Sequence, residues 1–418
     1  MSSSDRARIL VVGQDFPWPA TIGSHLRLAQ VIDAAGQIGD VDLFCLVPAR
    51  RTEPTVVPDE VRLSRAETLV RPLPQRSALL RLRWAFGSAL PLDVDRARLG
   101  DLALGFRRWA RPSYDAVWFS KASTYELLGR PRLGPTVVDL DDLEDHKVRG
   151  RRSPSPVGRS GTRVAAARLQ ARLDARRWHR LQRSVAGEVD VVVLCSELDA
   201  TRAGFANCAV VPNGYREPPV ALGRGAVGRP PTVLFAGSTC YGPNADAAHW
   251  LVSEIWPLVR SVDPGAVLRL VGEPGTSVLR LAMAPGVAVV GQVASMEPEL
   301  ARADVVVVPL RYGSGTRVKI LEAFAHRIPV VSTSLGAEGL GALHGVHLLV
   351  ADDPRSFAEA CVALATDTTL RARLVGGAHR LFQERFRWES STERVRSVLQ
   401  GVSVAAASVD ARSGGSRP

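Results

Sequence analysis

Residues 305–340 constrain the fold of this chain more than any other stretch. Val305–Leu310 is a continuous apolar run, which is typical of a strand buried on both faces of a parallel sheet. Gly313 and Gly315 follow it, and at glycines the backbone can approach a ligand closely. The helix expected over Thr316–His326 opens with unpaired backbone N–H groups and the positive end of its dipole. The stretch therefore predicts an α/β sheet with an anion site at the carboxyl end of one strand.

Charged residues gather around this predicted loop and helix. Arg311, Arg317 and Lys319 add three positive charges near the expected helix start. Glu322, two turns into the helix, is an acceptor for a pair of sugar hydroxyls. Cations, a glycine loop and one carboxylate together favour a nucleoside diphosphate with its ribose attached. The alternative is an ordinary strand–turn–helix of an α/β sheet that binds nothing.

The segment from Gly315 to Ala323 reads GTRVKILEA and resembles the donor-sugar half of GT-B glycosyltransferases of the retaining family 4. It is most similar to the subgroup with the signature GTR-x-K-x-LEA, found beside bacterial exopolysaccharide genes. In the wider family two glutamates stand eight positions apart. The second matches Glu322, whereas the first falls on Ser314, so one carboxylate is missing here. The resemblance implies two doubly wound Rossmann-like domains facing across a cleft, a nucleotide-sugar co-substrate, no metal or other cofactor, and retention of anomeric configuration. No nucleophilic carboxylate stands out in the sequence, so we expect front-face displacement.

The resemblance also assigns roles along the chain. Most of the wider family holds the diphosphate with an arginine and a lysine near the loop that here reads STCYGPN, which has neither. We therefore expect cations of the later loop to take that role. We assign catalytic roles to Asp141, Arg317 and Lys319. The residues expected to contact the donor are Gly23, Gly237, Arg311, Gly313, Ser314, Gly315, Thr316 and Glu322.

The length of 418 residues favours two domains. We predict an N-terminal Rossmann-like acceptor domain over 1–213, a linker over 214–230 and a C-terminal donor domain over 231–386. A helix at about 387–400 should cross back to the first domain, and 401–418 should be a disordered tail. Apolar runs near eighteen residues are missing, and the N-terminus leads directly into a strand at Ile9–Gly13, so we expect a cytoplasmic protein. The five cysteines are scattered, which favours reduced core residues over disulfides or a zinc site.

Acidic residues follow the strand predicted over Pro135–Asp142. Asp141 belongs to this cluster and could orient or deprotonate an acceptor hydroxyl. Two interpretations stay open, the catalytic one and a solvated acidic loop that caps the next helix. A helix is expected to begin near Ser24, with Gly23 before it, and Gly23 reads either as a donor contact or as a turn glycine. Of three histidines weighed as polar contacts, His25, His249 and His326, only His25 is retained. Glu338 either caps a helix or reaches the donor.

The net charge of +11 raises the question of an anionic partner. The helix expected over Thr162–Val185 alternates apolar residues with arginines, so it either lies on an anionic membrane, where lipid-linked acceptors are found, or packs in its domain with a solvated arginine face. The basic residues are spread along the chain without a recognition motif, so we expect no nucleic-acid partner. The predicted partners are a nucleotide-sugar donor and a glycan, lipid-linked or small-molecule acceptor.

Three other functions compete with glycosyl transfer. Nucleotide-sugar epimerases share the fold and would release no free nucleoside diphosphate. A nucleic-acid-binding protein would show steeply salt-dependent binding that nucleotide sugars leave unchanged. An inactive family member that acts as a scaffold is suggested by Ser314.

Overall fold

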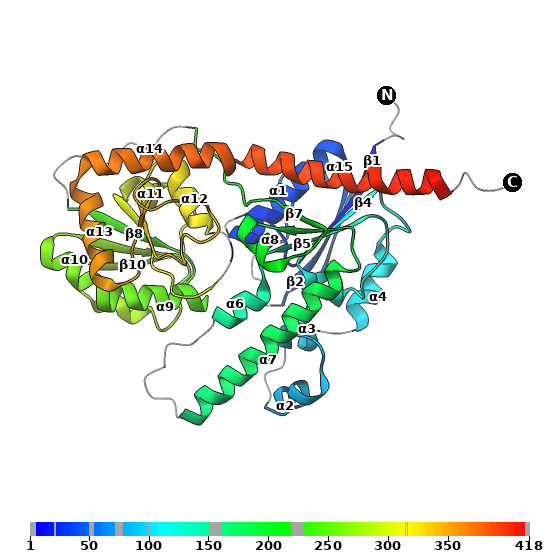
Figure 1. Cartoon of the computed structure of the whole chain (residues 1–418), viewed down its shortest axis with the longest axis horizontal. Coiled ribbons are helices and arrows are strands. Elements are labelled where there is room, and N and C mark those ends of the chain that lie inside the picture. The colour runs from blue at the N-terminus through cyan, green and yellow to red at the C-terminus, as the bar shows by residue number, and fades with distance from the viewer. Residues whose placement is uncertain are drawn as a thin grey trace. The chain divides into compact units, whose positions relative to one another are not determined.

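The computed structural model describes residues 6–20, 22–49, 54–71, 78–97, 100–150, 161–219, 230–313, 315 and 317–413. The chain divides into two compact units, which we call unit 1 (Met1–Gly214 with Glu389–Pro418) and unit 2 (Tyr215–Trp388). Each unit contains one parallel sheet with helices packed against it (Figure 1). The predicted fold class, two doubly wound α/β domains, is confirmed. Among the described helices, none combines the length and the apolar content needed to cross a bilayer.

Unit 1 is built on a seven-stranded sheet in the order β3-β2-β1-β4-β5-β6-β7. Its strands are β1 (Ala7–Gly13), β2 (Gly39–Pro48), β3 (Arg65–Arg71), β4 (Ala116–Ser120), β5 (Thr136–Asp141), β6 (Val191–Leu194) and β7 (Cys208–Val210). Its helices are α1 (Gly23–Ile38), α2 (Ala78–Gly87), α3 (Leu92–Ala97), α4 (Gly100–Trp109), α5 (Ala122–Leu127), α6 (Glu144–Gly150), α7 (Gly161–Ala186) and α8 (Glu197–Ala203). The central strands are buried on both faces because helices cover the sheet on both sides.

Unit 2 is built on a six-stranded sheet in the order β10-β9-β8-β11-β12-β13. Its strands are β8 (Thr232–Ala236), β9 (Val267–Val271), β10 (Val287–Gly291), β11 (Val305–Val308), β12 (Val330–Ser332) and β13 (Leu349–Val350). Its helices are α9 (Gly242–Trp250), a π-helical turn (Leu251–Ile255), α10 (Trp256–Val262), a 3-10 turn (Leu279–Met283), α11 (Glu297–Arg302), α12 (Val318–Ala325), α13 (Pro354–Thr366) and α14 (Thr368–Arg385). One apolar cluster joins the sheet to these helices.

The chain returns to unit 1 through the last helix, α15 (Trp388–Ser413). Val395, Leu399 and Val402 of this helix are buried in a core of unit 1 that also contains residues of β1 and β2. The predicted disordered tail from 401 onward is therefore wrong for 401–413. Packing of Val402 carries the helix past Gly401, and the run of three alanines at 405–407 favours its continuation.

Other local expectations also needed correction. The segment between β2 and β4, which is rich in proline and arginine and has no clear periodicity, forms β3 and the short helices α2, α3 and α4. Helix α1 begins at Gly23, and its N-cap is Ile22 without a side-chain bond, so Ser24 is not the cap. Leu258 and Val262 of α10 continue the helical spacing of the apolar residues before them, yet both are exposed, because a π-helical turn shifts the register of the helix before α10.

Candidate functional site

The centre of the sheet of unit 2 brings the predicted donor residues together. Strands β8 and β11 are neighbours, and the chain leaves them toward opposite edges of the sheet, β8 toward β9 and β11 toward β12. Ligands of open α/β sheets bind at the carboxyl ends of strands at such a reversal. Gly237 follows β8, and the loop that contains Gly313 and Gly315 follows β11. Both loops therefore lie at the carboxyl ends of two neighbouring parallel strands.

Lys319 lies at this point, in the first turn of α12. Its Nζ donates a hydrogen bond to Asn244 Oδ1 at 3.0 Å and lies 4.7 Å from the centroid of the Phe235 ring. Burial lowers the pKa of the Lys319 ammonium to about 7, with a further contribution from the charge of Arg317, while Glu322 opposes the shift. An approaching anion would therefore find a lysine that gains a proton on binding.

Gly237 makes room for this arrangement. Its φ is 144°, and a Cβ there would lie 2.7 Å from Asn244 Nδ2 and 2.9 Å from Lys319 Nζ. Glycine is the residue that accepts both the backbone conformation and the close approach. The predicted position of Gly237 beside the donor residues agrees with this geometry, through a contact with Lys319 that the sequence alone did not indicate.

Glu322 lies one turn after Lys319 on α12 and is half-buried. One of its oxygens accepts a hydrogen bond from the Tyr215 hydroxyl at 2.8 Å. Burial raises the pKa of the Glu322 carboxyl, while the Tyr215 bond and Lys319 oppose that rise. Burial also raises the pKa of Tyr215, and the Glu322 charge adds to that shift. The phenol therefore stays a donor and holds this carboxylate oxygen in place.

The loop between β11 and α12 differs from its prediction in one respect. Helix α12 begins at Val318, because Arg317 has the non-helical backbone of an N-cap, with φ −83° and ψ 85°. Arg317 is nevertheless buried, and a Cβ on Gly313 would lie 3.5 Å from its Nη2. Gly313 and Gly315 both have positive φ, which favours glycine at these positions. Ser314 and Thr316 lie outside the described residues.

Arg311 was expected to face the diphosphate. It instead makes a two-bond ion pair with Asp246, at 2.9 and 2.6 Å, and its guanidinium carbon lies 5.3 Å from the centroid of the Trp250 ring. The Asp246 charge offsets that of Arg311. The structure therefore brings Arg317, Lys319 and Glu322 together on α12 and its entry loop, and ties Arg311 to α9.

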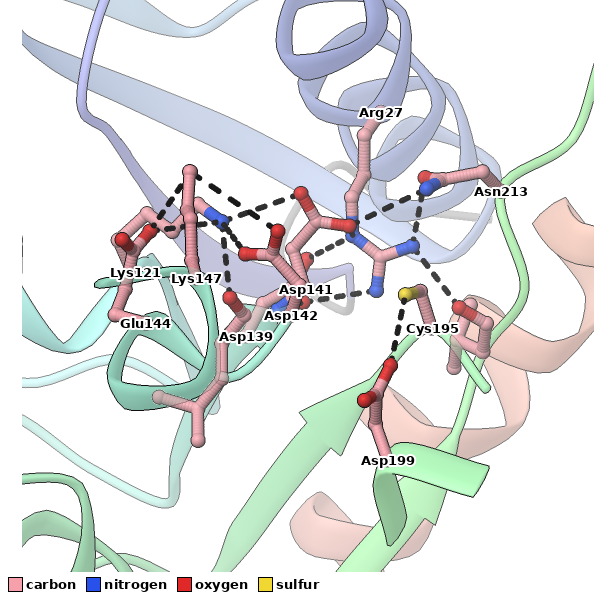
Figure 2. Close-up of polar contacts among 12 residues, drawn as sticks. Arg27, Lys121, Asp139, Asp141, Asp142, Glu144, Lys147, Cys195, Asp199 and Asn213 are labelled. Atoms are coloured by element: carbon pink, nitrogen blue, oxygen red, sulfur yellow. Dashed lines mark hydrogen bonds and ion pairs between the residues drawn. The ribbon is translucent and has the colours of Figure 1, made fainter. Parts of the chain in front are cut away.

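Unit 1 has a second polar site at the corresponding point of its own sheet, where β1 and β4 are neighbours and the chain leaves them toward opposite edges. Asp141 ends β5 beside it. Its two carboxylate oxygens accept hydrogen bonds from Lys121 Nζ and Asn213 Nδ2, each at 3.2 Å. Figure 2 shows these side chains converging with Arg27 on Asp141. Lys121 and Asp141 both have positive φ, 74° and 61°, which is uncommon for residues other than glycine.

Arg27 anchors this second site from α1. Its guanidinium makes a two-bond ion pair with Asp139 at 2.7 and 2.8 Å and donates further bonds to the Val211 carbonyl and to Asn213 Oδ1 (Figure 2). Both Arg27 and Asp139 are almost fully buried. Lys121 also contacts Asp142 Oδ1 at 3.1 Å, and the carboxylates of Asp141, Asp142 and Glu144 raise its pKa against the effect of burial.

The acidic cluster is therefore not the solvated cap that was the alternative interpretation. Asp139 and Asp142 are buried and paired with cations. The first N–H of α6, from Glu144, donates to Gln182 Oε1 at 2.9 Å. Among the described residues, no group of three or more His, Cys, Asp or Glu side chains has an arrangement that could hold a metal ion.

The remaining predicted residues lie as follows. Gly23 is the first residue of α1. His25 is buried, with Nε2 3.3 Å from Asp15 Oδ2 and Nδ1 3.3 Å from the Pro19 carbonyl oxygen. His249 is half-buried on α9, and His326 ends α12. Glu338 lies in a series of turns rather than at a helix start, so it caps no helix.

Several residues that complete the two sites were not predicted: Tyr215, Asn244, Lys121, Arg27 and Asn213. Tyr215 and Asn213 belong to the VPNGY segment, whose Asn-Gly pair is a turn signal. Asn244 lies in the STCYGPN loop, which has neither the arginine nor the lysine that most of the wider family carries there. The sequence around these residues indicated a turn or a loop, but it did not indicate which side chains would be in contact.

Comparison with known proteins agrees with this geometry. Residues 230–367, most of unit 2, match the family model described as glycosyl transferases group 1. A curated protein of Klebsiella pneumoniae, described as an uncharacterized 44.6 kDa protein in the cps region, is 26% identical over 163 residues, which are 37% of this chain and 42% of that protein. The chain thus matches less than half of the length of this relative.

Two solved structures are similar over nearly the whole chain. Sucrose-phosphate synthase from Thermosynechococcus elongatus matches with a TM-score of 0.68 and 16% identity, covering 96% of this chain and all of that one. Anabaena HepE in complex with UDP-glucose matches with a TM-score of 0.60 and 16% identity, covering 95% of this chain and all of that one. The fold is therefore GT-B, and residues 230–367 of unit 2 are similar to glycosyl transferases group 1.

Proposed function

We propose that this protein transfers a sugar from a nucleotide-sugar donor, held on unit 2, to an acceptor hydroxyl, with retention of anomeric configuration. The observation that carries the proposal is the pair formed by Lys319 and Glu322, one turn apart on α12 at the reversal point of the sheet. The positive charge of Lys319 suits the diphosphate of a nucleotide-sugar donor, and the carboxylate of Glu322 suits its ribose. The family match over residues 230–367 supports the same assignment.

Lys319 and Arg317 would bind the diphosphate. Charge builds on the leaving diphosphate as the bond between sugar and oxygen breaks, and fixed cations stabilise that charge in the transition state by about 2–4 kcal/mol per contact. Because the pKa of Lys319 is about 7 without ligand, a diphosphate would draw a proton onto it. The charge that the reaction needs would then be fully present when the donor is bound.

Glu322 would accept the two hydroxyls of the ribose. A carboxylate has acceptor sites on both oxygens, and the Tyr215 bond occupies one site on one of them. The remaining sites fit a vicinal diol. The HepE structure is a complex with UDP-glucose. UDP-sugars are therefore the first donors to test.

Asp141 is the residue that we assign to the acceptor. It lies at the carboxyl end of β5, fixed by Lys121 on one oxygen and Asn213 on the other. A carboxylate held in this way could orient a hydroxyl and accept its proton. The first of the two glutamates of the wider family is replaced by Ser314 in this chain, which favours front-face displacement over a covalent intermediate.

We propose polysaccharide or glycoconjugate synthesis as the setting, and the cps region named for the Klebsiella relative supports this assignment. A panel of nucleoside diphosphates and nucleotide sugars, screened by thermal shift, tests the donor assignment. Stabilisation by a UDP-sugar, followed by release of UDP with the sugar moved to an acceptor, supports the proposal. A new nucleotide sugar without free nucleoside diphosphate would instead indicate an epimerase.

A further inference from the structure

A surface of unit 1 carries large apolar side chains that face solvent. Phe86 and Leu82 of α2 are 87% and 58% exposed, and Leu169 of α7 is 59% exposed. We call these three residues, with the exposed arginines Arg83, Arg168, Arg172 and Arg176, the α2–α7 face. Figure 1 shows α2 and the N-terminal half of α7 standing out from the sheet of unit 1. Scattered apolar residues are common on surfaces, but a Phe and two Leu on two contacting helices form a group.

Contacts with α7 hold α2 in an orientation that leaves the side chains of Leu82 and Phe86 exposed to solvent. The Arg177 guanidinium of α7 stacks over the Trp84 ring at 4.1 Å and donates a hydrogen bond to the Ala85 carbonyl at 3.0 Å. Trp84 is buried and thus marks the inner side of α2. Leu82 and Phe86 stand two positions before and after it, which on a helix places both near the opposite side.

Both helices of this face are rich in arginine, whereas the next helix after α2, α3, contributes Asp93 and Asp95. Helix α7 (Gly161–Ala186) contains seven arginines and one acidic residue, and α2 contains two arginines and no acidic residue. Leu169, Arg172 and Arg176 stand at positions i, i+3 and i+7, so they share one side of α7. The two helices thus combine exposed apolar tips with arginine, the pattern of elements that bind at an anionic lipid interface.

The structure also limits this surface. Trp178 and Leu181 of α7 are buried in the core of unit 1, so the second half of that helix packs on its own sheet. The two halves of the amphipathic helix predicted over 162–185 therefore have different surroundings. Its C-terminal half belongs to the core, and its N-terminal half, together with α2, stays exposed.

We propose that the α2–α7 face docks on the surface of a bilayer that contains anionic phospholipid. Phe86 and Leu82 insert among the acyl chains, and the arginines bind the phosphate groups of the lipids. Charge complementarity selects this partner, since the four exposed arginines of the face attract an anionic surface, and the apolar tips would have no counterpart on a nucleic-acid backbone. This inference is independent of the donor site, which lies on unit 2.

The test is co-sedimentation of the full chain with vesicles of phosphatidylcholine, with and without about one-third phosphatidylglycerol. We expect binding to the anionic vesicles that falls as salt rises, and weak binding to pure phosphatidylcholine. The double variant Leu82→Ser with Phe86→Ser should bind at least tenfold more weakly. Its matched control is Val262→Ser with Met283→Ser, two apolar residues on unit 2 that are 66% and 88% exposed.

The arginines are tested in the same assay. Arg172→Gln with Arg176→Gln should weaken binding to anionic vesicles, whereas Arg355→Gln with Arg373→Gln, two exposed arginines of unit 2, should leave it unchanged. Unchanged melting temperature and nucleotide binding show that each variant is folded. The proposal would be overturned if all variants bound vesicles equally, or if the protein showed no preference for anionic lipid. It would also be overturned if the main effect of Leu82→Ser with Phe86→Ser were the loss of a dimer in sedimentation velocity. Binding of an oligonucleotide in place of vesicles would overturn it as well.

Discussion

The hydroxyl of Tyr215 donates a hydrogen bond to Glu322 across 2.8 Å. Tyr215 is the first residue of unit 2, and its backbone is bound on both sides, since its N–H donates to the Phe386 carbonyl and its carbonyl accepts from the Trp388 N–H. The two places where the chain passes between the units are therefore joined at Tyr215. Its side chain extends from that junction to the carboxylate that we assign to the ribose.

This relationship predicts the effect of Tyr215→Phe. The variant keeps the ring and removes the hydrogen bond. In the wild type this bond lowers the pKa of Glu322, so the pKa of Glu322 should be higher in the variant. Donor affinity should fall by about threefold to tenfold, because a hydrogen bond to a charged group is worth about 1 kcal/mol or more. Calorimetry with a UDP-sugar measures this, with Tyr241→Phe, an exposed tyrosine of the same unit, as the control. Equal affinity in both variants would show that the bond does not serve donor binding.

Lys319 predicts a pH dependence of donor affinity. The protonated lysine binds the diphosphate, and its pKa is about 7 in the free protein. Above pH 7 the donor must bring a proton onto the lysine, so the dissociation constant should rise by up to about tenfold per pH unit. Titrations at pH 8 in buffers of different ionisation enthalpy should show uptake of nearly one proton. Lys319→Arg, which stays charged, should bind with a flat profile over the same range. A flat wild-type profile would refute the assigned role.

Gly237→Ala should damage both stability and binding. The new methyl group would collide with Asn244 and Lys319, and the backbone φ of 144° strains any side chain, which together cost about 1–3 kcal/mol. Gly376→Ala on α14 is the matched control, since a Cβ there meets no atom within 4 Å. That variant should be as stable as the wild type or more stable by about 0.4–1 kcal/mol. Thermal and chemical unfolding measure both, and equal stability of the two variants would contradict the contact.

Asp141→Asn tests the acceptor assignment. The substitution should lower turnover, measured as release of nucleoside diphosphate in the presence of acceptor, by about 100-fold or more, because general-base catalysis contributes that much. Donor affinity should stay within about twofold, because Asp141 is assigned to the acceptor and not to the nucleotide. A similar loss in turnover and in donor affinity would make Asp141 a structural residue. Unfolding measurements distinguish that outcome, because Lys121 loses one of its carboxylate partners in the variant.

The fold was predictable because buried parallel strands leave a local record. β1, β8 and β11 are apolar runs, and each is fully buried over most of its length. Lys319 and Glu322 were predictable for a similar reason, since one turn of helix fixes their spacing. The segment that forms β3, α2, α3 and α4 gave no pattern, because its elements are short and rich in arginine.

The contacts that complete the sites could not be predicted from local sequence. Tyr215 and Glu322 are 107 positions apart, and Arg27 and Asp139 are 112 apart, so only the folded sheets bring them together. For Arg311 the local sequence suggested a contact that the folded chain does not make. Its position beside the glycine loop suggested the diphosphate, but Asp246, 65 positions away, binds its guanidinium. Charge alone predicts a site poorly when the partner of each charge is unknown.

The most direct test of the donor site is calorimetric titration of a UDP-sugar into the wild type, Lys319→Ala and Glu322→Ala, with Arg355→Ala as the control far along the chain. The account predicts binding by the wild type and the control, and a loss of tenfold or more, about 1.4 kcal/mol, in each of the two site variants. Unchanged affinity in both Lys319→Ala and Glu322→Ala would contradict a nucleotide-sugar site on α12.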